Sequence, residues 1–153
     1  MDKEILNGLE KLACVWPRVT GGTPPKHEDD TLRQLIEGES ASMAYYARMA
    51  SISGGNCRKM ALRHLAEERK HLHALQTEYF LRHGDSCPAP KPRQTRMPLL
   101  SLLREVYRAE LSGAETYRRA AQEDAALSAL YTRHAADEAR HAEALRRHIE
   151  RVI

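Results

Sequence analysis

The chain has 153 residues, enough for one domain with a substantial hydrophobic core. Hydrophobic residues make up 42% of it but aromatic residues only 5%, which favours packed helices over sheets, since sheets are rich in aromatic and β-branched side chains. The formal net charge is +3 and the basic residues are interleaved with acidic ones, which argues against a nucleic-acid-binding surface.

Membrane insertion and secretion are also disfavoured by the sequence. No segment approaches the ~20 consecutive apolar residues of a membrane span, and the acidic N-terminus lacks the apolar run of a secretory signal. We therefore expect a cytoplasmic location. The cysteines, Cys14, Cys57 and Cys87, are odd in number and form no CxxC pair, so reduced thiols are expected rather than disulfides or a thiolate metal site.

The first 28 residues are predicted to be a lead-in, a short helix followed by a loop, because residues 17–25 contain three prolines and two glycines. A helical domain is expected over residues 29–153. Its first helix is predicted from Thr31, which forms a capping-box signature with Gln34, to about Ser53.

A second helix is predicted to follow the helix-breaking pair Gly54 and Gly55, with Asn56 as its cap, and to continue to about His83. Residues 85–97 contain three prolines and are predicted to be a linker. Fully extended, this linker would span about 43 Å at ~3.3 Å per residue, which exceeds the ~30 Å length of a helix of about 20 residues.

A third helix is predicted to begin with Pro98 just inside its start and to end near Gln122, and a fourth, capped by Asp124, to reach almost to the C-terminus. The two short connections imply two antiparallel hairpins. Two hairpins joined by a long crossover are the topology of ferritin-like bundles. The sequence therefore predicts an all-α, ferritin-like four-helix bundle.

The two hairpins are related by an internal repeat. RHLAEERKHLHAL, starting at Arg63, matches RHAADEARHAEAL, starting at Arg133, with an offset of 70 residues. An offset of 71 places three residues of the first helix on three of the third: Glu39, Tyr46 and Ala50 on Glu110, Tyr117 and Ala121. Because Glu, Tyr and Glu-x-x-His recur in the same order in both halves, the pattern indicates a duplication with pseudo-two-fold symmetry.

Charged residues fall within the apolar stripes of the predicted helices. The steps of three and four residues that define a buried face pass through carboxylates and imidazoles at positions where leucine is expected. On the fourth helix this stripe is Leu127, Leu130, Tyr131, His134, Glu138, His141, Leu145 and Ile149. The other three helices show the same mixture, so the sequence predicts a polar cluster inside the bundle.

A pair of metal ions would explain such a cluster. Four buried carboxylates repel one another and lose hydration worth several kcal/mol each, and two divalent cations would balance their charge. One Glu from each of two helices, plus Glu-x-x-His from each of the other two, is the pattern of di-iron and di-manganese carboxylate bundles. Oxygen-rich ligation with imidazole suits iron or manganese. The predicted ligands are Glu39, Glu68, His71, Glu110, Glu138 and His141. The alternative is a metal-free bundle with hydrogen-bonded core histidines.

The sequence resembles rubrerythrins over roughly residues 31–150. EGESASMAYYARMA, around Glu39, is similar to their first-helix motif, and EERKHLHAL to their second-helix Glu-x-x-His. The resemblance implies that the six predicted ligands hold two iron ions, with manganese as the alternative. It also implies that Tyr46 and Tyr117 lie just beyond the ligands and assist the chemistry, although both tyrosines could equally be large core residues.

The function implied by this resemblance is an oxidoreductase that reduces hydrogen peroxide or oxygen, as a homodimer, with electrons from a separate redox protein. Two departures stand against a complete match. No paired CxxC motifs are present for a rubredoxin domain, and Gly113 occupies the position of an additional third-helix glutamate. An iron-storage protein with ferroxidase activity and a structural bundle with a vestigial metal site remain alternatives.

Two further histidines, His64 and His134, recur one turn before Glu68 and Glu138. Two roles are open for them. They could hydrogen-bond the ligands or transfer protons, or they could make polar contacts to a neighbouring helix.

Overall fold

The computed structural model describes residues 30–92 and 95–153, which contain four helices and no strand. The helices are α2 (Asp30–Ile52), α3 (Gly55–His83), α4 (Leu99–Glu123) and α5 (Ser128–Val152). The predicted all-α four-helix bundle is confirmed. The predicted lead-in and Cys14 lie outside the described residues.

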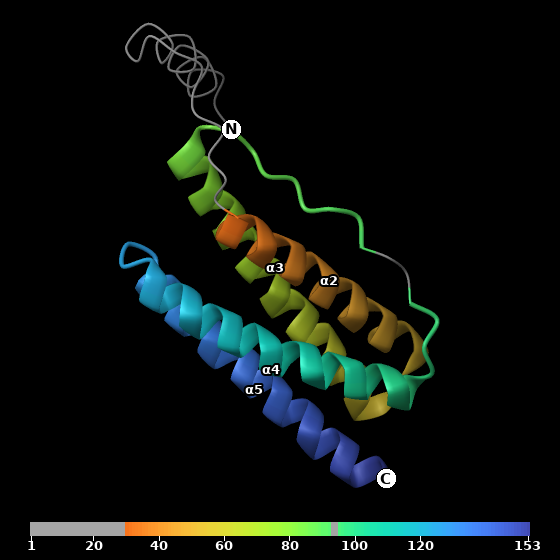
Figure 1. Ribbon diagram of the computed structural model, residues 1–153. Helices are drawn as coiled ribbons and strands as arrows, with labels where there is room; N and C mark the ends of the chain where they lie inside the picture. Colours follow the sequence, from red (N-terminus) through yellow and green to blue (C-terminus); the bar gives the residue numbers. More distant parts are fainter. Residues whose placement is uncertain (1–29, 93–94) are drawn as a thin grey trace, which may run out of the picture.

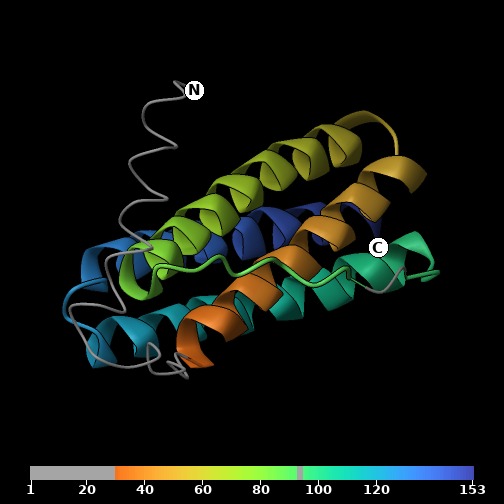
Figure 2. The same cartoon turned by 90° about the horizontal axis from the view of Figure 1, so that it is seen from above.

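The helices form two hairpins, α2 with α3 and α4 with α5, that pack against each other (Figure 1). Contacts between α2 and α4 and between α3 and α5 join the hairpins, so the helices follow the order α2, α3, α5, α4 around the bundle. The crossover from α3 to α4 runs along the bundle beside α2 (Figure 2). The Ser40 hydroxyl donates a 2.8 Å hydrogen bond to the carbonyl of Pro90, and Gln76 donates one of 3.0 Å to that of Cys87. The crossover is therefore fixed to the first hairpin, as the predicted topology requires.

Helix ends differ from the prediction by a few residues, and the predicted caps of α2 and α3 are wrong. Thr31 and Asn56 both lie inside the first turns of their helices, because α2 begins at Asp30 and α3 at Gly55. Gly54 is the residue before α3 and provides no side-chain cap. Pro98 likewise precedes α4 rather than opening it. The two-residue connection between α2 and α3 leaves no room for a separate capping residue.

Asp124, predicted to cap the fourth helix, instead follows the last residue of α4, and Leu127 precedes α5 without a side-chain cap. Oδ1 of Asp124 accepts the backbone N–H groups of Ala126 and Leu127, at 3.1 and 3.2 Å, in the connection between the two helices. A turn over residues 125–127 then leads into α5. At the other end of the bundle, Gly84 closes α3 with φ of 68°, a left-handed conformation that glycine adopts without strain.

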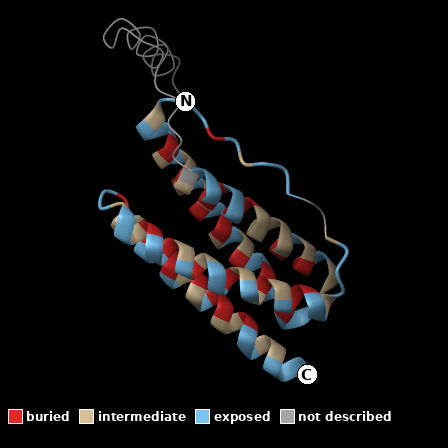
Figure 3. Ribbon diagram, viewed as in Figure 1, coloured by how far each residue is buried: buried red, intermediate tan, exposed pale blue. Residues whose placement is uncertain are grey.

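The interior consists of two apolar clusters with polar residues between them. One cluster contains Leu32, Ile36, Leu75 and Tyr131, and the other contains Tyr46, Met49, Leu102 and Leu145. Buried residues follow the inward faces of all four helices (Figure 3). Cys57 and Cys87 are free thiols buried in this interior, in agreement with the prediction. Among the described helices, none is long and apolar enough to cross a membrane.

Candidate metal centre

The six predicted ligands come together in the middle of the bundle. Glu39 comes from α2, Glu110 from α4, and each Glu-x-x-His pair from α3 or α5. All six side chains are buried, and Glu68, Glu110 and His141 are completely inaccessible to solvent. The antiparallel hairpins bring both copies of the repeat to the same level, so the two halves of the site face each other.

The six residues divide into two overlapping groups whose potential ligand atoms lie within 4.8 Å of one another. One group is Glu39, Glu68, His71 and Glu138, and the other is Glu68, Glu110, Glu138 and His141. Glu68 and Glu138 belong to both. The cluster therefore has two shared carboxylates in its middle and one pair of residues at each end, Glu39 with His71 and Glu110 with His141. The sequence did not predict which carboxylates are shared.

The ligand histidines direct their Nδ1 atoms into the cluster. Nδ1 of His71 lies 3.7 Å from Glu39 and 3.4 Å from Glu138, and Nδ1 of His141 lies 2.8 Å from Glu68 and 3.4 Å from Glu110. None of these contacts is aligned as a hydrogen bond from Nδ1. Each histidine therefore presents an inward nitrogen that a cation between the carboxylates could use.

The outward nitrogens are held by carboxylates that the sequence analysis missed. Nε2 of His71 lies 3.0 Å from Asp137, and Nε2 of His141 lies 2.5 Å from Glu67. A carboxylate partner at Nε2 holds the proton there and leaves the Nδ1 lone pair free for a metal. Glu67 and Asp137 directly precede the shared glutamates in each copy of the repeat, and this adjacent pair of acids was the available signal.

Arg140 joins these two outer carboxylates across the hairpins. Its guanidinium donates to Asp137 at 2.5 Å and to Glu67 at 3.2 Å. Partial burial opposes ionisation of Glu67 and Asp137, but the hydrogen bonds from His141 and His71, and after them Arg140, hold the pKa of both carboxyls below their usual values. The outer carboxylates therefore stay ionised, as acceptors for the histidine N–H groups must be.

The two tyrosines contact the site, but each reaches the glutamate of the opposite hairpin. The Tyr46 hydroxyl of α2 donates a 2.7 Å hydrogen bond to Glu110 of α4, and the Tyr117 hydroxyl of α4 donates to Glu39 of α2. Burial and the neighbouring carboxylates raise the pKa of both phenols, so both remain protonated. The tyrosines are therefore proton-bearing partners of the two end glutamates.

Burial and mutual repulsion change the protonation of the cluster itself. Burial, together with the charges of Glu138 and Glu39, raises the pKa of Glu68 to about 12. Burial also raises the pKa of Glu138, to about 8. For His71, the nearby carboxylates outweigh burial and raise the pKa to about 11. These sites hold protons at neutral pH when no cation is present, and metal binding must displace them.

The cluster meets the donor requirements of a divalent metal pair. Seven buried oxygen and nitrogen atoms of the six residues have no hydrogen-bond partner within the described part of the chain, whereas buried polar atoms are normally paired. They are Glu39 Oε2, both oxygens of Glu68, His71 Nδ1, Glu110 Oε2, Glu138 Oε1 and His141 Nδ1. Four carboxylates and two imidazoles form the donor set of iron and manganese carboxylate sites.

Gly113 provides space for one of the shared carboxylates. A Cβ atom at this position would lie 2.8 Å from Oε2 of Glu138, closer than a carbon–oxygen contact allows. The missing side chain therefore has a steric reason: the carboxylate of Glu138 occupies the space that a side chain at residue 113 would fill.

Replacing Gly113 with alanine tests this packing. We expect the variant to fold, because alanine favours a helix by about 1 kcal/mol over glycine and the displaced atom is the end of a flexible side chain. Its metal affinity is expected to fall by roughly tenfold or more, because Glu138 is pushed from its position. Gly38→Ala is the matched control, since Gly38 is also helical and its Cβ would meet nothing within 4 Å. Isothermal titration calorimetry with Mn(II) measures the metal affinity of both variants. Equal affinities of the Gly113→Ala and Gly38→Ala proteins would contradict the assigned role of Gly113.

His64 and His134 stack on the ligand histidines of the opposite hairpin. The ring centroids of His64 and His141 are 4.2 Å apart, and those of His134 and His71 are 4.1 Å apart. Burial and the adjacent ligand histidine lower the pKa of His64 to about 3 and that of His134 to about 4. Both rings are therefore neutral at physiological pH. Neither of the two sequence-based interpretations included ring stacking.

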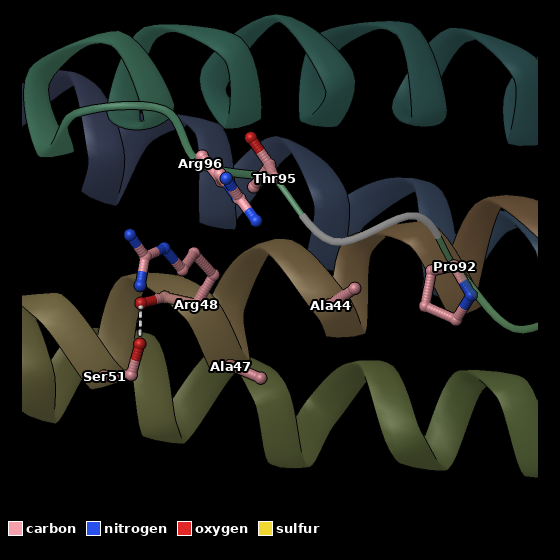
Figure 4. Close-up of a pocket in the computed structure, with 7 residues that line it drawn as sticks. All are labelled: Ala44, Ala47, Arg48, Ser51, Pro92, Thr95 and Arg96. Carbon is pink, nitrogen blue, oxygen red and sulfur yellow. Dashed lines mark hydrogen bonds between the residues drawn. The ribbon is translucent and has the colours of Figure 1, made fainter.

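A surface pocket of about 820 Å³ lies away from this cluster, between α2 and the crossover. Arg48 and Ser51 of α2 face Thr95 and Arg96 of the crossover there (Figure 4). None of the six predicted ligands lines it. The acidic cluster is instead enclosed by side chains of the bundle.

Comparison with known proteins supports the fold alone. No protein-family profile matches the chain, and no curated protein matches it significantly. Among solved structures, the chain is similar to a conserved hypothetical protein from Mycobacterium tuberculosis, with 17% sequence identity and a TM-score of 0.62. The match covers 86% of this chain and 100% of the other. The four-helix architecture is thus shared with a solved structure, and the chemistry of the site depends on the residues described above.

Proposed function

We propose that the bundle binds two iron ions, or alternatively two manganese ions, and acts as a rubrerythrin-type oxidoreductase that reduces hydrogen peroxide or oxygen. The observation that carries the proposal is the set of seven unpaired, buried donor atoms on six residues from four helices. Such a set is costly in an empty core, since each unpaired polar group costs about 1–3 kcal/mol. Two divalent ions would pair these atoms and balance the four carboxylates.

Each residue has a defined task in this proposal. Glu39 with His71 and Glu110 with His141 would hold one ion each, and Glu68 and Glu138 would link the two ions. Asp137 and Glu67 orient the histidines through their outward nitrogens. The hydroxyls of Tyr117 and Tyr46 donate hydrogen bonds to Glu39 and Glu110. They keep two protons beside the cluster, in a region that excludes bulk water.

Iron in this setting would supply electrons to the O–O bond of the bound oxidant. Complete reduction of one hydrogen peroxide consumes two electrons and two protons and releases two molecules of water. Repeated turnover therefore requires an external electron donor, for which a small redox protein is the class we propose.

Iron storage is the second candidate, because the same donor set would hold Fe(II) while dissolved oxygen accepts its electrons and oxidises it to ferric iron. A structural bundle with a vestigial site is the third. Storage requires ferric iron to accumulate beyond two ions per chain, and a vestigial site binds none. The two alternatives are thus separated from the proposal by the amount of metal bound.

Metal stoichiometry tests the proposal most directly. Protein loaded with Fe(II) without oxygen, or with Mn(II), and then desalted is expected to contain about two ions per chain by elemental analysis. The double variant Glu68→Ala with Glu138→Ala should remain helical by circular dichroism and bind no metal, because both shared ligands are lost. Absence of bound metal in the unmodified protein would refute the site.

A further inference from the structure

The internal repeat gives His64 and His134 equivalent positions, but the two histidines are not used equally. Nδ1 of His64 lies 3.3 Å from the hydroxyl of Tyr46, a hydrogen-bonding distance. The ring of His134 packs edge-on against Tyr117, 5.1 Å between centroids, and its Nδ1 has no hydrogen-bond partner in the described part of the chain. His134 is also 95% buried, being only 5% exposed. Of these two histidines, therefore, only His134 has a buried Nδ1 without a hydrogen-bond partner among the described residues.

The His134 side chain lies beside one end of the cluster. His134 has a potential ligand atom within 4.8 Å of ligand atoms of both Glu39 and His71. Among the described residues, His64 forms no equivalent group with Glu110 and His141. The pseudo-symmetry of the repeat is thus broken at this point, and the ion at the Glu39 end has one more nitrogen donor within reach than the ion at the Glu110 end.

We propose that His134 is a seventh, one-sided metal ligand that makes the Glu39 and His71 half of the site the tighter and more nitrogen-rich of the two; this inference rests on the proposed metal pair. Two donors on opposite sides of an ion, each ~2.1 Å from it, are about 4.2 Å apart. The donor atoms of His134, Glu39 and His71 lie within 4.8 Å of one another, so they need to approach by no more than a few tenths of an ångström to bind one ion. Ligation also requires the His134 ring to tilt out of its stack on His71. The ring can tilt without breaking a hydrogen bond at Nδ1, since it makes none.

The steric constraint at Gly113 acts on Glu138, which both halves of the site share. A side chain at residue 113 would collide with Glu138, so this residue cannot supply a further ligand from α4. The imidazole on α5 is the remaining buried donor next to Glu39 and His71. The further ligand would therefore be a neutral nitrogen, which stays in the same charge state when the ion changes its oxidation state.

Simple aromatic packing is the competing explanation, and a substitution to phenylalanine separates the two. His134→Phe retains the ring, the stack on His71 and the contact with Tyr117 but removes the nitrogen. His64→Phe is the matched control, since it removes the equivalent ring nitrogen from the other half of the repeat. Circular dichroism and thermal melting of the metal-free proteins establish that both variants fold.

The test is titration with Mn(II), followed by pulsed electron paramagnetic resonance at one equivalent. The unmodified protein is expected to bind two ions in steps of unequal affinity, the first ion being coordinated by two imidazole nitrogens. His134→Phe should weaken the tighter step by roughly tenfold or more and leave one coordinated imidazole. His64→Phe should leave the tighter step and its nitrogen count unchanged.

Two results would overturn the inference. If the unmodified protein binds two ions and His134→Phe changes neither affinity nor nitrogen count, or changes them no more than His64→Phe does, then His134 is only a packing residue and the proposed function stands. If the unmodified protein binds no metal, both the function and this inference fail.

Discussion

Loading the protein with Fe(II) or Mn(II) is expected to raise its melting temperature by roughly 10 °C for each ion bound. An ion that binds only the folded state stabilises it by RT ln(1 + [L]/Kd), which is about 2.7 kcal/mol at a hundredfold excess over Kd. For a domain of this size, 1 kcal/mol corresponds to a few degrees. Thermal melts with and without metal, and with a chelator added afterwards, measure the shift.

The size of this effect follows from the burial of the cluster. Glu39, Glu68, Glu110 and Glu138 lie in a region closed to solvent, where mutual repulsion destabilises the metal-free fold or forces proton uptake. Burial, and after it the charges of the neighbouring glutamates, raises the pKa of both Glu68 and Glu138. Metal ions replace these protons with stronger positive charge, so the stability of the bundle depends on them.

The double variant Glu68→Gln with Glu138→Gln is the appropriate comparison. Glutamine keeps the shape of the side chain and removes the charge, so the metal-free variant should melt at or above the temperature of the metal-free unmodified protein, with no response to metal. Leucine at Glu39 and Glu110 is less suitable, because it would leave the hydroxyls of Tyr117 and Tyr46 without acceptors. A melting temperature of the unmodified protein that does not change with metal would contradict the model of a dinuclear site.

The sequence predicted the bundle and all six clustered residues because both depend on short-range periodicity. Glutamates and histidines at three- and four-residue steps among leucines must face the core if the segment is a helix, and the repeat at offsets of 70 and 71 doubled that signal. The crossover was predicted from its prolines and its reach. The place of Tyr46 and Tyr117 beside the six residues was implied by the resemblance to rubrerythrins, and both hydroxyls contact glutamates of the cluster.

Contacts between the two hairpins could not be predicted from the sequence. The crossed pairing of Tyr46 with Glu110 and of Tyr117 with Glu39 arises because α2 and α4 pack side by side, and no spacing within one helix encodes it. Arg140 resembles any surface arginine until the fold places Glu67 beside Asp137. The helix caps failed for a local reason, since the tight turn at Gly54 allowed α3 to begin without one.

With iron bound and reduced, hydrogen peroxide is expected to oxidise the site faster and more completely than oxygen. A pair of ferrous ions holds two electrons, which is the number that converts one peroxide into two molecules of water. Oxygen needs four electrons to reach water, so a single site can take it only as far as peroxide. The buried phenols that donate hydrogen bonds to Glu39 and Glu110 remain protonated beside the cluster. Reduction of peroxide consumes two protons at this place.

Stopped-flow mixing of the anaerobic, iron-loaded protein with each oxidant measures this preference. The variant Glu68→Gln with Glu138→Gln, mixed with the same amount of iron, provides the rate of oxidation outside the site. We expect one peroxide consumed per two ferrous ions, and weak multiple turnover until a small redox protein is supplied as reductant. Gly113 provides no carboxylate beside Glu138, which also favours slow turnover.

The outcome separates the three functions. Faster reaction with oxygen, together with ferric iron accumulating beyond two ions per chain, would support iron storage and contradict the peroxidase activity. No reaction with either oxidant, in protein that retains no iron after desalting, would leave only the structural bundle with a vestigial site. Faster reaction with peroxide, at a stoichiometry of one peroxide per iron pair and lost in the double variant, is the result expected for a two-electron peroxide reductase built on the Glu68 and Glu138 pair.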